Sequence, residues 1–87
     1  MKEYQLKSLY DARKSFYGKA VVTEDEKTST LYSYNRKTAT FESGGKFRIY
    51  NIQSMTTSRH IKEFYKQNTG GKEITRKEMD KILERED

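Results

Sequence analysis

The sequence predicts an α+β domain: an antiparallel four-stranded meander capped by one helix, with a further helix at the C-terminus. Two observations favour this fold. Between residues 20 and 52, short β-prone runs alternate with turn residues roughly every eight to ten positions. After residue 55, the apolar spacing changes from two to three or four. The 87 residues suffice for one domain with a modest core.

The meander is predicted from alternating β-branched and aromatic residues. The expected strands are residues 20–24, 28–34, 37–42 and 46–52. In the second strand, Leu31 lies on one face and Tyr32 and Tyr34 on the other, because successive strand residues point to opposite faces. Asn35–Arg36 is expected to form a tight turn, since Asn tolerates left-handed conformations. Ser43–Gly45 is expected to form a hairpin turn.

The covering helix is predicted over residues 56–68, where Ile61 and Phe64 recur at helical spacing. Its candidate N-cap residues are Thr56, Thr57 and Ser58. Gly70–Gly71 supplies glycines for its end. Residues 4–14 are ambiguous, and their apolar spacing suits a short amphipathic helix.

The C-terminal helix is predicted over residues 74–86 and opens on a capping box formed by Thr75 and Glu78. Gly70–Gly71 precedes it as a hinge. The expected organisation is a small α+β domain over residues 1–70 and a helical extension over 71–87, within a single domain overall. We therefore expect deletion of residues 71–87 to leave a folded body.

The expected core joins the sheet to the covering helix, because a sheet with one apolar face needs a second layer to bury that face. Its predicted members are Leu31, Phe41, Ile49, Ile61 and Phe64.

Composition excludes several classes of protein. There is no Cys, which excludes disulfide scaffolds and thiol nucleophiles, and the one His, His60, excludes a multi-histidine metal site. We expect His60 to be structural and predict neither a metal nor a cofactor. No run approaches the roughly 18 apolar residues of a membrane span, and the first residues do not form a secretory signal. The expected location is the cytoplasm, without membrane contact.

The charge is concentrated in the body of the chain. The formal net charge is +5, made up of +6 in residues 1–70 and −1 in residues 71–87. A basic body attracts nucleic acid or an acidic protein surface. The alternative is an ordinary solvated surface, because this net charge is usual for a small domain.

Two sets of residues are candidates for partner binding. Arg59, Lys62 and Lys66 form a basic stripe on the predicted helix, away from its apolar face, and suit a phosphate backbone or an acidic partner. On the sheet, the candidates are Tyr32, Tyr34, Tyr50 and Arg48. Tyrosine and arginine together suit base stacking on single strands or a protein interface. Each set also has an interpretation without a binding role: the helix stripe as an ordinary solvated face, and the sheet residues as half-buried strand residues.

Three blocks of sequence resemble a known family. They are Lys14–Ala20 (KSFYGKA), Leu31–Asn35 (LYSYN) together with Ala39, and Thr56–Phe64 (TTSRHIKEF). They are similar to a family of short, uncharacterised proteins encoded by phages and prophages of Gram-positive and gut bacteria. The resemblance covers roughly residues 10–68. It implies a phage origin and a small non-enzymatic protein, and it carries over neither an established activity nor catalytic residues.

The expected function is that of a non-enzymatic, phage-encoded binding protein that inhibits a host defence component through protein–protein contact, as anti-CRISPR proteins do. The phage context that the resemblance implies favours a host protein, or a protein–nucleic-acid complex, as the partner. The basic body disfavours mimicry of DNA. Two alternatives stay open: a small basic nucleic-acid-binding accessory protein of the phage, and a scavenger of small nucleotide signals. A homodimer is compatible with each of these, and the expected location is the host cytoplasm.

Overall fold

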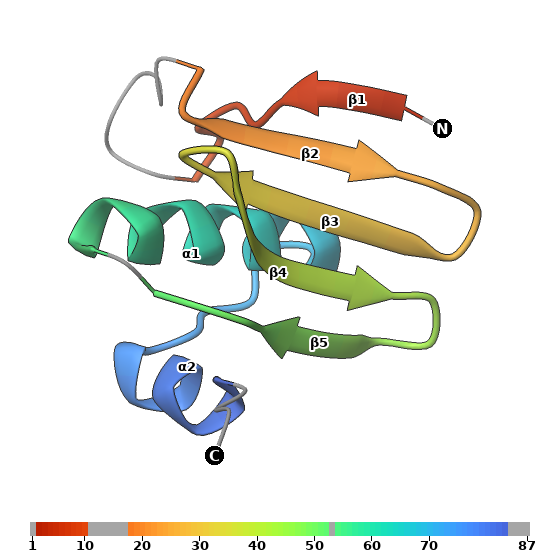
Figure 1. Cartoon of the computed structure of the whole chain (residues 1–87). Coiled ribbons are helices and arrows are strands. Elements are labelled where there is room, and N and C mark those ends of the chain that lie inside the picture. Colours follow the sequence, from red (N-terminus) through yellow and green to blue (C-terminus); the bar gives the residue numbers. More distant parts are fainter. Residues whose placement is uncertain (1, 11–17, 53, 84–87) are drawn as a thin grey trace.

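Among the described residues, five antiparallel strands lie in the sheet in the order in which the chain runs through them (Figure 1). The computed structural model describes residues 2–10, 18–52 and 54–83. The strands are β1 (Lys2–Gln5), β2 (Ala20–Glu24), β3 (Thr28–Ser33), β4 (Arg36–Glu42) and β5 (Lys46–Ile49). The predicted α+β class and antiparallel meander are confirmed in this form, but the sheet has one strand more than predicted.

The additional strand is β1, which pairs with β2 so that Glu3 lies opposite Thr23 and Gln5 opposite Val21. The ambiguous segment, residues 4–14, thus begins as an edge strand. The short helix that its apolar spacing suggested does not form over residues 4–10, and residues 11–14 lie outside the described residues. All four residues of β1 are exposed. An exposed edge strand has no buried face, so it carries no alternation of apolar residues that would reveal it.

The β3–β4 hairpin turns one residue earlier than predicted. Tyr34 and Asn35 both have positive φ, at 52° and 67°, and Ser33 pairs with Arg36 across them. Positive φ at both central residues is the geometry of a type I′ turn, whose twist matches that of a two-residue hairpin. Tyr34 therefore belongs to the turn, and the expected turn at Asn35–Arg36 is wrong by one position.

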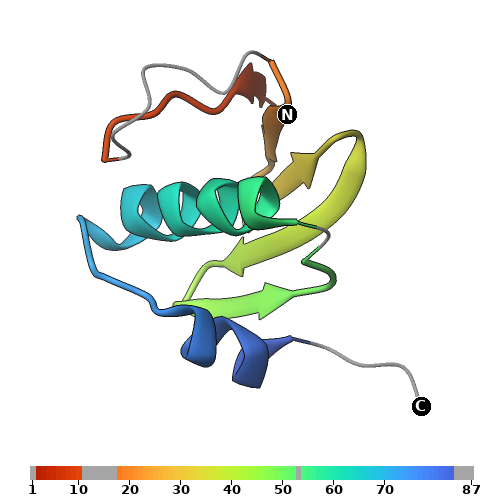
Figure 2. The ribbon, with the colours of Figure 1, turned by 90° about the vertical axis from the view of Figure 1, so that its left-hand side faces the viewer.

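Helix α1 (Met55–Thr69) covers one face of the sheet (Figure 2). Ile61 and Phe64 are buried in one cluster with Leu31 and Ile49, as predicted. The start of the helix differs from the prediction, because Ser54 caps it by accepting a hydrogen bond from the Thr57 backbone N–H. Gly70 ends it in the left-handed conformation, as expected.

Phe41 is the one predicted core residue that is only half-buried. It lies at the margin of the cluster with two other aromatic residues, and its ring centroid is 6.0 Å from that of Phe47 and 6.4 Å from that of Tyr65. β4 approaches its end at Phe41, which therefore closes the core at its rim.

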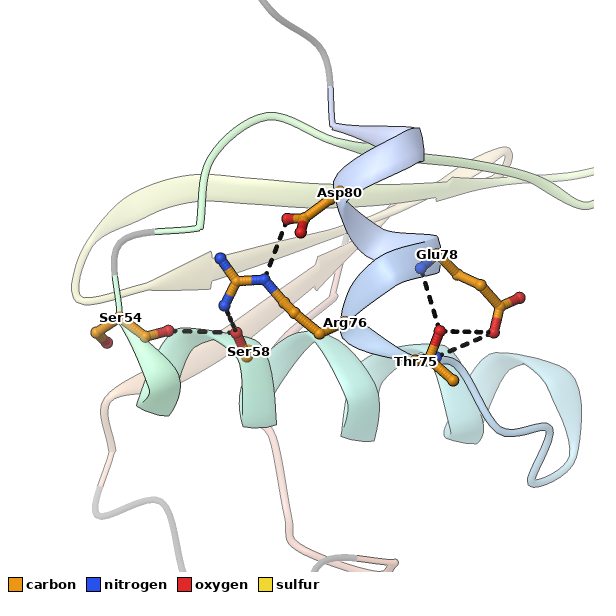
Figure 3. Close-up of polar contacts among 6 residues, drawn as sticks. All are labelled: Ser54, Ser58, Thr75, Arg76, Glu78 and Asp80. Atoms are coloured by element: carbon orange, nitrogen blue, oxygen red, sulfur yellow. Dashed lines mark hydrogen bonds and ion pairs between the residues drawn. The ribbon is translucent and has the colours of Figure 1, made fainter.

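Helix α2 (Arg76–Ile82) packs beside β5, and Ile49 forms an isolated bridge with Leu83. The predicted capping box of Thr75 and Glu78 is confirmed. Arg76 of α2 links the two helices (Figure 3). Its guanidinium donates hydrogen bonds of 3.0 Å to the Ser58 hydroxyl on α1 and of 3.1 Å to the Asp80 carboxylate on α2.

The extension after Gly70 shares the core of the body. Ile74 is 3% exposed and Met79 0% exposed, and both belong to the cluster that contains Ile49 and Phe64. The division at residue 70 stays a prediction. Deletion of residues 71–87 would remove the buried Met79, however. We therefore expect this deletion to weaken the fold, contrary to the expectation from the sequence.

The stabilising contribution of Tyr4 on β1 is lost at alkaline pH. Its hydroxyl donates a 2.5 Å hydrogen bond to the Glu24 carboxylate, and partial burial together with this bond raises the pKa of Tyr4 from 10.0 to about 12. The folded state therefore holds this proton more tightly, so the contribution is complete below pH 10 and is lost between pH 10 and 12. We expect the wild type to lose more stability than Tyr4→Phe between pH 9 and pH 11.5, measured by urea unfolding. An equal loss in both proteins would contradict this assignment.

Candidate binding site

The basic stripe lies on the outer face of α1. Arg59, Lys62 and Lys66 recur at the spacing of one helix face, on the side opposite Ile61 and Phe64. All three residues of the stripe are half-buried, which leaves part of each accessible. Their outward placement follows from the same periodicity that turns the apolar residues towards the sheet.

The charges of the stripe are only partly neutralised. Lys66 Nζ lies 3.4 Å from the Glu73 carboxylate, whereas Arg59 and Lys62 form no ion pair within the described residues. The first turn of α1, residues 55–58, which is described throughout, contains no acidic residue. The outer face of α1 is therefore a cationic surface on which two of the three charges have no ion-pair partner among the described residues.

The second candidate set occupies the outer face of the sheet. Strand alternation and register put Tyr32, Arg48 and Tyr50 on the face opposite the one that packs on α1. Lys37 Nζ lies 4.8 Å from the centroid of the Tyr50 ring, and the Tyr50 hydroxyl lies 3.2 Å from that of Thr40. No described helix or strand lies over this face of the sheet (Figure 2).

Arg48 is distinctive within this face. Its Nε is shielded from solvent and has no hydrogen-bond partner, and the guanidinium forms no ion pair with any described residue. A partly desolvated cation without a counter-charge gains strongly from an incoming carboxylate or phosphate.

The two candidate sets lie on opposite layers of the molecule. The stripe of Arg59, Lys62 and Lys66 faces away from the sheet, while Tyr32 and Arg48 face away from α1. The structure therefore brings together the members of each set but separates the two sets. One flat partner surface cannot contact both.

Tyr34 does not join the sheet face on which it was predicted. It lies in the β3–β4 turn and is 43% exposed, and its ring centroid is 5.9 Å from that of His60 on α1. The positive φ of the turn redirects the side chain, so strand alternation does not extend to this residue.

A buried polar cluster joins α1 to the end of β3. The Ser33 hydroxyl lies 2.8 Å from His60 Nδ1 and 3.2 Å from the Thr57 hydroxyl, and all three residues are 0% exposed. Because no substrate can reach these groups without opening the fold, the pair of serine and histidine serves to orient α1 on the sheet. The expected structural role of His60 agrees with this geometry.

Glu63 extends the buried polar side of α1 towards the N-terminal segment. Its carboxylate accepts hydrogen bonds from the Tyr10 backbone N–H at 2.8 Å and from the Gln67 side chain at 2.6 Å, and Gln67 in turn donates to the Lys7 carbonyl. The polar residues Thr57, His60, Glu63 and Gln67 recur at helical spacing. That spacing is the signal by which the sequence could have revealed a second packed side of this helix.

Metal-binding groups and membrane-spanning helices are absent from the described part of the chain. It contains no group of three or more His, Asp or Glu side chains that could hold a metal ion. No helix among the described residues is long and apolar enough to cross a membrane. The lining of the hollow between the hairpin tips, which includes Asp25, Lys27 and Glu42, contains none of the candidate partner-binding residues.

Comparison with known proteins places the chain in one family. A family model described as "Family of unknown function (DUF8033)" matches residues 4–81. No curated protein and no solved structure matches the chain.

Proposed function

The chain belongs to the DUF8033 family, whose function is unknown, and on this premise we propose that it is a non-enzymatic protein that binds an anionic macromolecule through the outer face of α1. The observation that supports the proposal most directly is that two cations on this face, Arg59 and Lys62 beside Lys66, form no ion pair with any described residue. A stripe of like charge on a packed helix steers an oppositely charged partner and accelerates association.

The proposed partner is a protein with an acidic surface. The similarity to short phage and prophage proteins supports a specific form of this proposal, in which the partner belongs to a bacterial host and binding inhibits a defence component, as anti-CRISPR proteins do. The net charge of +5 argues against mimicry of DNA, which requires an acidic surface.

Nucleic acid is the second candidate partner, favoured by the geometry of the stripe. At 1.5 Å of rise per residue, Arg59 and Lys66 lie about 10 Å apart along the helix axis, so the stripe is long enough to contact more than one phosphate group. Salt distinguishes the two partners: binding to duplex DNA would weaken with a log–log slope of about −0.9 for each phosphate contacted.

The test reverses the stripe in a triple variant, Arg59→Glu with Lys62→Glu and Lys66→Glu. We expect the variant to fold, because the three residues lie outside the buried apolar cluster, and to lose at least tenfold in partner affinity, mainly through slower association. A matched control reverses three exposed cations elsewhere, Lys19, Lys27 and Arg36. Each triple reversal changes the net charge from +5 to −1, so the two variants differ only in position.

The measurement is affinity capture from a bacterial host lysate, with and without nuclease, followed by binding kinetics with each species captured. Capture that survives nuclease, persists in the control and is lost in the stripe variant supports the protein partner. Capture that nuclease abolishes transfers the proposal to nucleic acid. Equal loss in both triple variants would reduce the effect to net charge and overturn the proposed surface.

A further inference from the structure

One cross-strand row on the outer face of the sheet carries opposite charges at its two ends. Through successive register pairs, the row runs Glu3, Thr23, Thr30, Thr40, Arg48, with one residue from each strand. At about 4.8 Å between neighbouring strands, the two charges lie roughly 19 Å apart. Thr30 on β3 marks the centre of the row.

The two terminal charges of the row lie on the two edge strands of the sheet, β1 and β5. Neither Glu3 nor Arg48 forms an ion pair within the part of the chain that the structure describes. Lys46 and Glu42 form no ion pair within the described residues either, but they lie opposite each other in the register, so their opposite charges are adjacent within the sheet, and Lys37 lies over the Tyr50 ring. Glu3 is exposed on the β1 edge, so its carboxylate is accessible to a second molecule.

We propose that the outer face of the sheet binds a second copy of this chain, face to face, about a twofold axis that runs along β3. This axis exchanges the two edges of the sheet. It sets Arg48 of each copy against Glu3 of the other and places Thr30 and Tyr32 opposite their own counterparts. Two ion pairs and a central tyrosine pair then join the copies.

The charges select this orientation over its alternative. A twofold axis perpendicular to the strands would leave each edge facing the same edge of the second copy, with Arg48 against Arg48 and Glu3 against Glu3. Like charges in contact oppose association. Only the axis along the strands makes the row complementary to itself, as a twofold interface requires.

The residues between the charges suit a sheet-to-sheet contact. Thr23, Thr30 and Thr40 have short side chains, and sheets pack face to face about 10 Å apart. Tyr32 and Val21 occupy the next row and add half-buried apolar surface. A nucleic acid on the same face would bring its phosphates against Glu3 and Glu42, so the mixed signs favour a second copy.

This inference goes beyond the proposed function and does not depend on it. The stripe of Arg59, Lys62 and Lys66 lies on the other layer, so sheet-to-sheet packing leaves both stripes of a dimer facing outwards on opposite sides. A dimer would then present two equivalent cationic surfaces, which strengthens binding to a partner that offers two sites within reach.

We expect the dimer to be weak, with a dissociation constant on the order of 10–100 µM, because the contacts across the face must first offset the translational and rotational freedom lost on association. Sedimentation velocity across this concentration range measures it. Raising the salt concentration should weaken the dimer, because its two ion pairs lie at the rim of the contact.

The decisive experiment is a charge exchange in the full chain. Arg48→Glu and Glu3→Arg should each raise the dissociation constant at least tenfold, since each creates two like-charge contacts per dimer. Combining them in one chain restores both ion pairs with reversed sign and should return the constant to within about threefold of the wild type. The matched controls Arg36→Glu and Glu26→Arg change exposed charges outside the row and should leave dimerisation unchanged.

Three outcomes would overturn the inference. In the first, the wild type stays monomeric throughout the concentration range. In the second, the double variant does not dimerise although circular dichroism shows that it is folded. In the third, the wild type is monomeric and binds a labelled oligothymidylate through Arg48. The last would assign the face to single-stranded nucleic acid. None of these outcomes bears on the stripe of α1, which the capture experiment tests separately.

Discussion

Phe64→Ala is expected to lower the free energy of unfolding by about 3–5 kcal/mol, the usual loss when a buried aromatic side chain is truncated. Phe64 is 1% exposed at the centre of the cluster that joins α1 to the sheet, and its ring centroid lies 6.4 Å from that of Phe47. Because a domain of this size has a total stability of only several kcal/mol, the variant should be largely unfolded at 37 °C.

Urea unfolding followed by circular dichroism measures the loss. Leu9→Ala is the matched control, because it also removes a large apolar side chain, but from a position that is 69% exposed. It should change the stability by no more than about 0.5 kcal/mol. An unchanged melting temperature in Phe64→Ala would show that α1 does not cover the sheet as described.

Deletion of residues 71–87 is expected to have the second-largest effect, because it removes Ile74 and Met79 from the core and exposes the surfaces of Ile49 and Ser58 that α2 covers. The truncated chain should melt at least 10 °C below the full chain or fail to fold. Met79→Ala isolates the apolar part of this effect and should cost about 2–5 kcal/mol in the full chain.

The control for Met79→Ala is Lys81→Ala, which changes an exposed residue of the same helix and should leave the stability almost unchanged. A truncated chain as stable as the full one, with Met79→Ala neutral, would restore the original expectation of an independent extension. Met79→Ala stays informative even if the truncated chain does not fold.

The fold could be predicted where residues are buried on one side. The alternation around Leu31 and the helical spacing of Ile61 and Phe64 each mark a core face, and the structure confirms both. The exposed strand β1 has no such mark. The β3–β4 turn was misplaced because Tyr34 and Asn35 adopt a conformation that usually needs Gly, and the pairing across the hairpin, rather than the local sequence, imposes it.

The candidate residues could be assigned from the sequence to two outer faces, one of the helix and one of the sheet. Alternation put Tyr32 outside the core, and helical spacing did the same for Lys62. In a two-layer domain, the outer faces of the two layers point in opposite directions, so the separation follows from the predicted fold itself. The cross-strand row between Glu3 and Arg48 could not be predicted from the sequence. Its recognition requires the strand β1 and the register of the strands, which only their pairing in the structure determines.

The packing of α2 against β5 also bears on aggregation. An uncovered edge strand offers unpaired backbone N–H and C=O groups on which another chain can extend the sheet. At one edge, β1 is short and begins with the charged residues Lys2 and Glu3, whereas β5 is flanked by α2 and bridged through Ile49 to Leu83. Fraying of α2 would free Lys46–Ile49, so a partly unfolded chain with its sheet intact would be the species that nucleates intermolecular β-pairing. Substitutions that stabilise this short helix should therefore slow aggregation even where they leave the melting temperature of the sheet unchanged.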